Sequence, residues 1–163
     1  STKTPYKVLF LCTGNSARSI LLEAILNRDG AARGIRAYSA GSKPAGQVHP
    51  QSLRLLSGLG VATDALRSKS WDEFASPGAP VMDAVITVCG SAAGETCPFW
   101  PGAPVRAHWG VEDPAAAPVA DQPAAFAAAY DRLAARAKAL LAVGPADLDR
   151  AALQAELTRI GTI

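Results

Sequence analysis

The sequence contains few of the residues that build disulfide frameworks or metal clusters. Its 163 residues include three cysteines and two histidines. An odd and low cysteine count argues against a secreted protein held together by disulfides, and it favours a cytoplasmic protein with free thiols. Cys12, Cys89 and Cys97 have no CxxC spacing. A zinc site that uses the two histidines remains an alternative, but we expect no metal and no cofactor.

Strong charge and long apolar segments are also absent. The formal net charge is +2 and the Lys and Arg residues form no run, so a nucleic-acid partner is not expected. No apolar segment approaches the roughly 20 residues that a membrane-spanning helix needs. Residues 1–12 lack the apolar core and the small-residue cleavage site of a signal peptide. These absences predict a globular cytoplasmic protein with no membrane partner.

Apolar strand-like segments alternate with segments of helical periodicity along the chain. This alternation indicates an α/β fold with a parallel sheet and right-handed crossovers. In such sheets, ligands bind at the carboxyl ends of the strands. The predicted strands are 6–11, 35–41, 83–89 and 105–110, and the predicted helices are 17–30, 50–60, 122–142 and a tail helix within 147–160.

The segment VLFLCTGNSARS, residues 8–19, places a cysteine between a buried strand and a polar turn. Successive N–H groups of such a turn, together with the positive end of the following helix, form a nest for a tetrahedral oxyanion. Arg18 can add a bidentate contact. The same positive field favours the Cys12 thiolate, whose pKa is expected to fall from ~8.5 into the range ~3.5–7.5. Ser19 is placed to donate a hydrogen bond to this thiolate. The predicted oxyanion-binding residues are Thr13, Gly14, Asn15, Ser16, Ala17, Arg18 and Ser19.

A Cys-x5-Arg pattern alone is a weak signal, because many cysteines at strand ends are inert packing residues. The order of strand, turn, arginine and helix favours a reactive Cys12 beneath a bound oxyanion. A nucleotide-binding P-loop is excluded, since the sequence has no GxxxxGK[ST] motif.

This segment is similar to the phosphate-binding loop shared by low-molecular-weight protein tyrosine phosphatases and the arsenate reductases of the same fold. The resemblance continues through AYSAG, VITVC, the pair Cys97–Pro98 and HWGVEDP, up to about residue 142. The downstream cysteine pair and HWG-x-x-DP match the arsenate reductases. The resemblance implies a three-layer fold in which helices flank a central parallel four-stranded sheet. It assigns residues 1–143 to the catalytic domain and 144–163 to a C-terminal helical extension.

The resemblance also implies a relay of three cysteines. Cys12 attacks arsenate, Cys89 attacks Cys12, and Cys97 attacks Cys89. Two thiols that form one disulfide supply the two electrons that reduce As(V) to As(III). Thioredoxin is the implied reductant, and glutaredoxin or glutathione is the alternative, because Cys97 is one residue farther from Cys89 than in the best-known thioredoxin-coupled members. Phosphate and sulfate are expected to compete with arsenate.

The segment HWGVEDP supplies the expected general acid. By resemblance, Asp113 protonates the departing oxygen. An aspartate before proline is also a common turn or capping residue, and this reading remains open. His108 and Trp109 are expected to be structural, and Glu112 is expected to be solvated.

Two further matches concern the surroundings of the loop. Glu23 and Ser39 match positions that bind a potassium ion together with Asn15 in some arsenate reductases. The acidic residue of that site aligns with Trp71, so no potassium site is expected. Many relatives have a second cysteine at the position of Ala17, and its replacement leaves the proposed relay intact.

Two other functions remain as alternatives. A low-molecular-weight phosphatase would leave Cys89 and Cys97 without a role, and the aromatic residue that such enzymes have after the Asp-Pro pair is absent from PAAAPVA. An oxyanion-binding or redox-sensing module without enzymatic activity would leave Asp113 without a chemical role.

Overall fold

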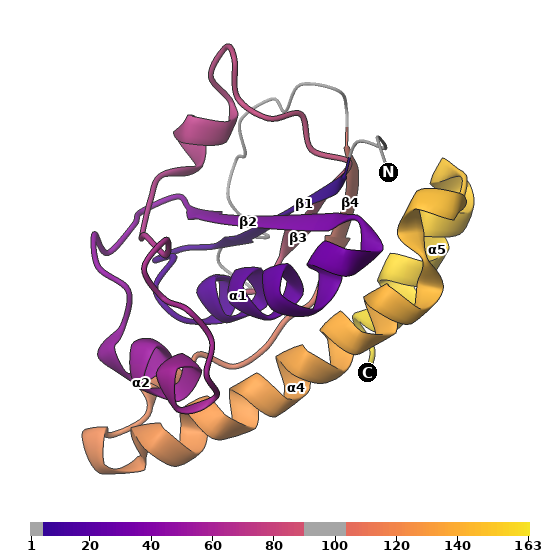
Figure 1. The fold of residues 1–163 in the computed structure, drawn as a ribbon. Coiled ribbons are helices and arrows are strands. Elements are labelled where there is room, and N and C mark those ends of the chain that lie inside the picture. Colours follow the sequence, from indigo (N-terminus) through magenta and orange to yellow (C-terminus); the bar gives the residue numbers. More distant parts are fainter. Residues whose placement is uncertain (1–4, 90–103) are drawn as a thin grey trace.

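The computed structural model describes residues 5–89 and 104–163, and the predicted relay residue Cys97 lies outside the described residues. The described strands form one parallel sheet in the order β2-β1-β3-β4 (Figure 1). This architecture confirms the predicted parallel four-stranded sheet. The strands are β1 (Tyr6–Cys12), β2 (Ile35–Gly41), β3 (Ala84–Thr87) and β4 (Val105–His108).

Helices pack against this sheet and bury both of its central strands. Residues 8–11 of β1 are fully buried, and their apolar run shows no alternation because both faces of the strand are covered. One face packs with the helices in the larger core, and the other face packs with Phe74 and Met82 in a smaller core. The described helices are α1 (Arg18–Gly30), α2 (Pro50–Gly58), α4 (Gln122–Val143) and α5 (Arg150–Ile160).

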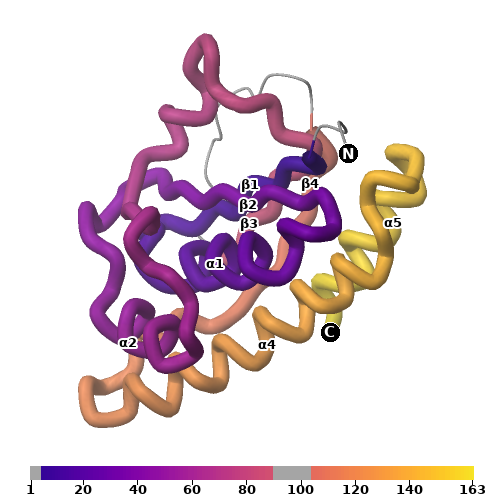
Figure 2. The backbone as a smooth tube through the Cα atoms, viewed as in Figure 1, coloured from indigo at the N-terminus to yellow at the C-terminus, as the bar shows by residue number. Residues whose placement is uncertain are grey.

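The C-terminal helix α5 lies beside β4, at the end of the long helix α4 (Figures 1 and 2). Its apolar side chains Leu153, Leu157 and Ile160 are buried in the larger core. The indole nitrogen of Trp109, which follows β4, donates a hydrogen bond of 2.9 Å to the Leu157 carbonyl. The predicted extension therefore packs against its own chain, and a domain boundary at residue 143 stays a prediction.

The strand order creates a crevice between β1 and β3. The chain leaves β1 toward β2 on one side and leaves β3 toward β4 on the other side. The two carboxyl ends therefore form a switch point, which is where parallel sheets bind ligands. Cys12 is the last residue of β1, and Cys89 follows the end of β3 by two residues. The topology thus brings two distant cysteines to one place.

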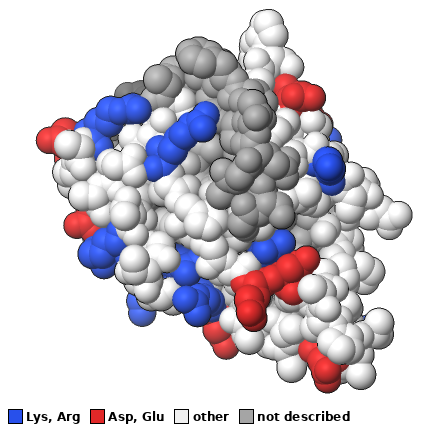
Figure 3. Space-filling view, turned by 180° about the vertical axis from the view of Figure 1, so that it is seen from behind, with Lys and Arg blue, Asp and Glu red and all other residues white. Residues whose placement is uncertain are grey.

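The visible surface carries mixed charge. Basic and acidic side chains both occur over the described part of the face in Figure 3, without a continuous basic stripe. No helix among the described residues is long and apolar enough to span a bilayer.

Candidate active site

The residues after β1 form a loop whose carbonyl groups accept hydrogen bonds from residues outside the loop. The Thr13 carbonyl accepts from the Lys43 amide at 3.0 Å, and the Gly14 carbonyl accepts from the Ala45 amide at 2.9 Å. The Ser16 carbonyl accepts from the His49 amide at 3.0 Å. In a trans peptide the next N–H points away from the carbonyl. The amides of residues 14, 15 and 17 are therefore directed away from these outer partners, as an oxyanion nest requires.

Asn15 holds the turn of this loop in a left-handed conformation. Its φ of 46° makes it the described non-glycine residue with positive φ. The side chain is fully buried, and both the nitrogen and the oxygen of its amide form hydrogen bonds. Its Nδ2 donates to Ser19 Oγ at 2.9 Å, and its Oδ1 accepts from the Lys69 amide at 2.9 Å. These contacts make Asn15 a structural support of the loop.

One cavity of about 510 Å³ brings together most of the predicted site residues. Asn15 and Ser19 lie behind its wall as buried supports. The Ser19 hydroxyl accepts from Asn15, so its own proton remains available to donate, and its bond to a Cys12 thiolate stays a prediction. The cavity is lined by Cys12, Thr13, Gly14, Ser16, Ala17, Arg18, Cys89, Asp113 and Ala115.

The structure corrects the prediction that the pKa of Cys12 is lowered. Cys12 and Cys89 are both buried thiols on the wall of the cavity. The hydrogen bond with Cys89 and the burial of the sulfur raise the pKa of the Cys12 thiol above its usual value. Arg18 and the Asn15 amide act in the opposite direction and lower this pKa, but they do not prevail. The sequence indicates the positive field of the loop, but only the fold places the Cys89 thiol next to Cys12.

Arg18 joins the loop to the segment after β4. Its Nη1 donates to the Val111 carbonyl at 2.8 Å, and its Nη2 lies 3.7 Å from Asp113 Oδ2. Its buried Nε has no hydrogen-bond partner among the described residues. Buried donors without partners are rare, so this N–H is available to a bound oxyanion.

Asp113 has two contacts, of which one is the expected capping contact, and its role as general acid stays a prediction. Its Oδ1 accepts from the Ala115 amide at 3.0 Å and caps a short 3-10 turn at Pro114–Ala116. Its Oδ2 faces Arg18, and its side chain is 44% exposed. The capping contact fixes the carboxyl group at the mouth of the cavity, where it could protonate a departing oxygen. Glu112 is exposed, as expected.

The two histidines and Trp109 have structural contacts. His49 caps the start of α2, because its side chain accepts from the Gln51 amide at 3.1 Å. His108 lies 2.7 Å from the Thr87 hydroxyl. Trp109 is fully buried and packs against Phe10.

A lysine occupies the surroundings of the matched potassium residues. The Lys69 ammonium lies 3.5 Å from Glu23 Oε1, which also accepts from the Ser39 hydroxyl at 2.6 Å. Because a resident cation already faces the Glu23 carboxylate, these residues do not fit a potassium ion. No cluster of three or more metal-ligating side chains occurs among the described residues.

Sequence reasoning missed some residues that shape the loop. A Cβ atom on Gly41 would lie 2.4 Å from the Thr13 carbonyl oxygen, so only glycine permits the end of β2 to approach the loop. The hydroxyls of Ser52 and Ser68 donate to the carbonyls of Ser16 and Gly14. Gly41 stands in the AYSAG segment and could have been noticed there, whereas the serines and Lys69 carry no local signal.

Comparisons with known proteins agree with this geometry. The family model of low molecular weight phosphotyrosine protein phosphatases matches residues 7–157. An arsenate reductase of Halalkalibacterium halodurans is 33% identical over 139 residues, which cover 84% of this chain and 96% of that protein.

Solved structures show the same fold. An arsenate reductase in its phosphate-binding state superposes with a TM-score of 0.68 at 26% identity, over 85% of this chain and 98% of that one. The thioredoxin-dependent arsenate reductase of Corynebacterium glutamicum gives a TM-score of 0.66 at 24% identity, over 91% of this chain and 66% of that one. The chain belongs to the low molecular weight phosphotyrosine protein phosphatase family, in the branch of its arsenate reductases.

Proposed function

We propose that the protein reduces arsenate to arsenite through a thiol relay that begins at Cys12. The observation that carries this proposal is the second thiol: Cys89 lines the same anion cavity as Cys12 and forms a hydrogen bond with it. A hydrolytic phosphatase needs one nucleophilic sulfur, whereas a two-electron reduction needs two sulfurs that can form a disulfide.

In the first step, arsenate binds to the loop amides and to the Arg18 guanidinium. Because the pKa of the resting Cys12 thiol is raised, its proton passes to the bound arsenate dianion as the sulfur attacks arsenic. An S–As bond forms and an As–O bond breaks. Asp113 gives a proton to the departing oxygen, which leaves as water.

In the second step, the Cys89 sulfur attacks the Cys12 sulfur. The S–S bond forms, the S–As bond breaks, and its electron pair stays on arsenic, which takes up the Cys89 thiol proton on an oxygen and leaves as arsenite, As(III). The two thiols are oxidised to one disulfide, so the electrons balance. The crevice between β1 and β3 favours this step because the two cysteines reach it from adjacent strands.

The third step restores the site. Cys97, which lies outside the described residues, attacks Cys89. The new Cys89–Cys97 disulfide is then reduced by an external reductant. Thioredoxin is the proposed reductant, as for the related Corynebacterium glutamicum enzyme, and glutaredoxin with glutathione is the alternative. We place this reaction in the cytoplasm, where such reductants keep thiols reduced.

The test is arsenate-dependent NADPH oxidation with thioredoxin and thioredoxin reductase, measured for the wild type and for each Cys→Ser variant. We expect steady turnover to be lost in all three variants. In a single turnover without reductant, the Cys97→Ser variant should still release one arsenite per protein, whereas Cys12→Ser and Cys89→Ser should release none. Steady turnover of Cys97→Ser with thioredoxin would refute its role. Turnover with glutaredoxin and glutathione but not with thioredoxin would refute thioredoxin as the reductant.

The phosphatase alternative has a separate assay. Hydrolysis of an aryl phosphate requires Cys12 but not Cys89, so a phosphatase would keep its full rate in Cys89→Ser. We expect that any such rate is small beside arsenate reduction, and that phosphate and sulfate inhibit reduction by competing for the loop. A dominant aryl phosphatase rate, unchanged in Cys89→Ser, would overturn the proposal.

A further inference from the structure

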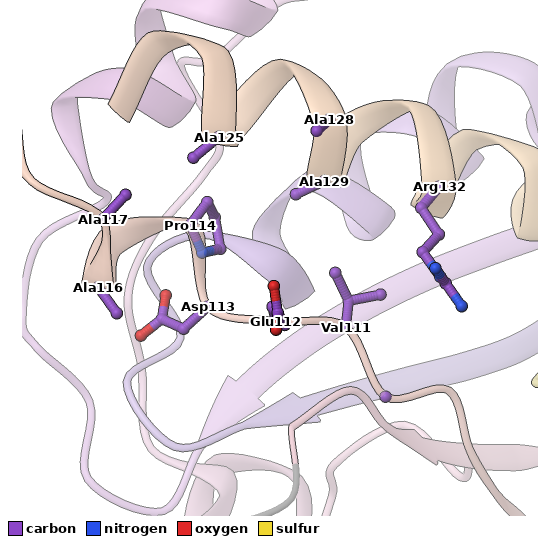
Figure 4. Close-up of a pocket in the computed structure, with 11 residues that line it drawn as sticks. Val111, Glu112, Asp113, Pro114, Ala116, Ala117, Ala125, Ala128, Ala129 and Arg132 are labelled. Atoms are coloured by element: carbon purple, nitrogen blue, oxygen red, sulfur yellow. The ribbon is translucent and has the colours of Figure 1, made fainter. Parts of the chain in front are cut away.

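The segment that carries Asp113 packs against the rest of the chain at only some of its residues. This segment, residues 110–114, is called the acid loop below. A cavity of about 840 Å³ separates it from α4. The α4 side of this cavity presents the short side chains of Ala125, Ala128 and Ala129 (Figure 4). These methyl groups leave the space unfilled, so packing holds the loop mainly through its two apolar residues, Val111 against the larger core and the buried Pro114.

Hydrogen bonds also hold the acid loop: the Val111 amide donates to the Val88 carbonyl at 3.2 Å, and two consecutive carbonyl groups accept from arginines. The Arg18 guanidinium binds the Val111 carbonyl at 2.8 Å. The Arg136 guanidinium binds the Gly110 carbonyl at 3.1 Å. Hydrogen bonds from a charged donor are about twice as strong as those between neutral groups. Arg18 belongs to the oxyanion loop, whereas Arg136 comes from α4 and does not line the substrate cavity.

Arg136 also connects the acid loop to the end of the chain. Its Nη2 donates to the carbonyls of Gly161 at 3.3 Å and Ile163 at 3.2 Å. The side chain is only 1% exposed, and it forms no ion pair with an acidic residue in the described part of the chain. A buried guanidinium is unfavourable unless its N–H groups are bound. The Arg136 Nε has no hydrogen-bond partner among the described residues, so the carbonyls bound by Nη1 and Nη2 are needed to keep the group in place.

The C-terminal segment is itself anchored next to the acid loop. A Cβ atom on Gly161 would lie 2.6 Å from the His108 carbonyl oxygen, which shows how closely the segment approaches the end of β4. The Trp109 indole, directly before the acid loop, binds the Leu157 carbonyl of α5. Movements of α5 would therefore be transmitted to Arg136 and to the Gly110 carbonyl.

We propose that Arg136, held by the C-terminal segment 161–163, is a positioning residue that keeps the acid loop in place so that Asp113 can act as the general acid. This inference rests on the proposed function, because it requires Asp113 to be the acid. It gives the C-terminal helix a role in catalysis without any contact to the substrate.

The test is a double-mutant cycle between Arg136→Met and Asp113→Asn. The measured quantity is the single-turnover rate of arsenate-dependent formation of the Cys12–Cys89 disulfide. General acid catalysis contributes roughly 10²- to 10⁴-fold, so Asp113→Asn should lower the rate by about this factor. We expect Arg136→Met to lower the rate about 10-fold in the wild-type background and less than 2-fold in the Asp113→Asn background, because it acts through Asp113. Phosphate affinity should change less than 2-fold.

The matched control is Arg132→Met, one turn earlier on α4. Arg132 also lines the cavity behind the acid loop, but it is exposed to solvent, unlike the buried Arg136. We expect a rate within 2-fold of the wild type. If Arg136→Met does not fold, deletion of residues 161–163 removes two carbonyl partners of Arg136 and no fully buried side chain. This deletion should lower the rate in the wild-type background and not in the Asp113→Asn background.

The outcomes separate this inference from the proposed function. An equal rate loss from Arg136→Met, or from the deletion, in both backgrounds would overturn the positioning role, and so would an equal loss in Arg132→Met. An Asp113→Asn rate equal to that of the wild type would refute the role of Asp113 as general acid, and it would refute the positioning role of Arg136 as well.

Discussion

The buried Asn15 side chain offers a quantitative test of how the oxyanion loop is held. Asn15→Ala removes the acceptor of the Lys69 amide and the donor to the Ser19 hydroxyl. A buried amide left without a partner costs about 1–3 kcal/mol. The left-handed conformation costs roughly 1–2 kcal/mol more for an ordinary residue. The free energy of unfolding should therefore fall by about 2–5 kcal/mol, a large fraction of the about 5–15 kcal/mol of a typical domain.

Urea unfolding of the reduced protein measures this loss. With a slope of about 2 kcal/mol per molar urea, a loss of about 3 kcal/mol lowers the midpoint by roughly 1.5 M. Phosphate affinity should also fall, because the loop amides no longer converge. Asn15→Gly loses the same hydrogen bonds but avoids the backbone strain, so it should be the more stable of the two variants.

Asn27 provides the matched control. Its side-chain amide, like that of Asn15, makes two hydrogen bonds, here both with the Ala37 backbone at 3.0 and 2.8 Å, but it lies inside the helix α1. In a helix, glycine is less stable than alanine by about 0.5–1 kcal/mol, so the order of the Ala and Gly variants should be reversed at this position. Phosphate affinity should not change. If Asn15→Ala costs less than 1 kcal/mol, or if it is more stable than Asn15→Gly, the reasoning about strain and hydrogen bonding is refuted.

Three further outcomes are expected. Cys89→Ala removes the hydrogen bond that raises the pKa of Cys12, so the pH profile of Cys12 alkylation by iodoacetamide should move to lower pH; an unchanged profile would show that Cys89 does not control this thiol. The raised pKa means that the folded protein keeps the Cys12 proton at pH values at which the unfolded chain has released it. The free energy of unfolding should therefore fall as the pH rises above the ordinary thiol pKa of about 8.5, and it should fall less steeply in Cys12→Ser. Lys69→Met leaves the Glu23 carboxylate without its cation, so the free energy of unfolding should fall by about 3–5 kcal/mol, and potassium should restore part of this loss. A stability equal to that of the wild type would refute the pairing of Lys69 with Glu23.

Local parts of the site could be predicted from the sequence because they depend on neighbouring residues. The apolar run of β1, the turn after Cys12 and the start of α1 at Arg18 follow one another within residues 6–18. Such a strand, turn and helix are specified by short-range sterics and by the periodicity of apolar residues. The parallel sheet followed from the alternation of these elements.

The electrostatics of the site could not be predicted in this way. Asn15 meets Lys69 across 54 residues, and Thr13 meets Cys89 at 3.5 Å across 76 residues. Neither contact has a spacing that a sequence pattern reveals. The pKa of Cys12 was therefore predicted in the wrong direction, because its sign depends on a thiol that arrives from another strand.

The sequence by itself determined the chemistry that is available: a cysteine under an oxyanion nest, an arginine beside it and an aspartate after the last strand. The tertiary structure decided what these groups do to one another. The strand order β2-β1-β3-β4 places Cys89 beside Cys12, and Arg136 holds the acid loop from behind. The physical reason is that burial and hydrogen bonding depend on distances in space, which the topology sets and local sequence does not.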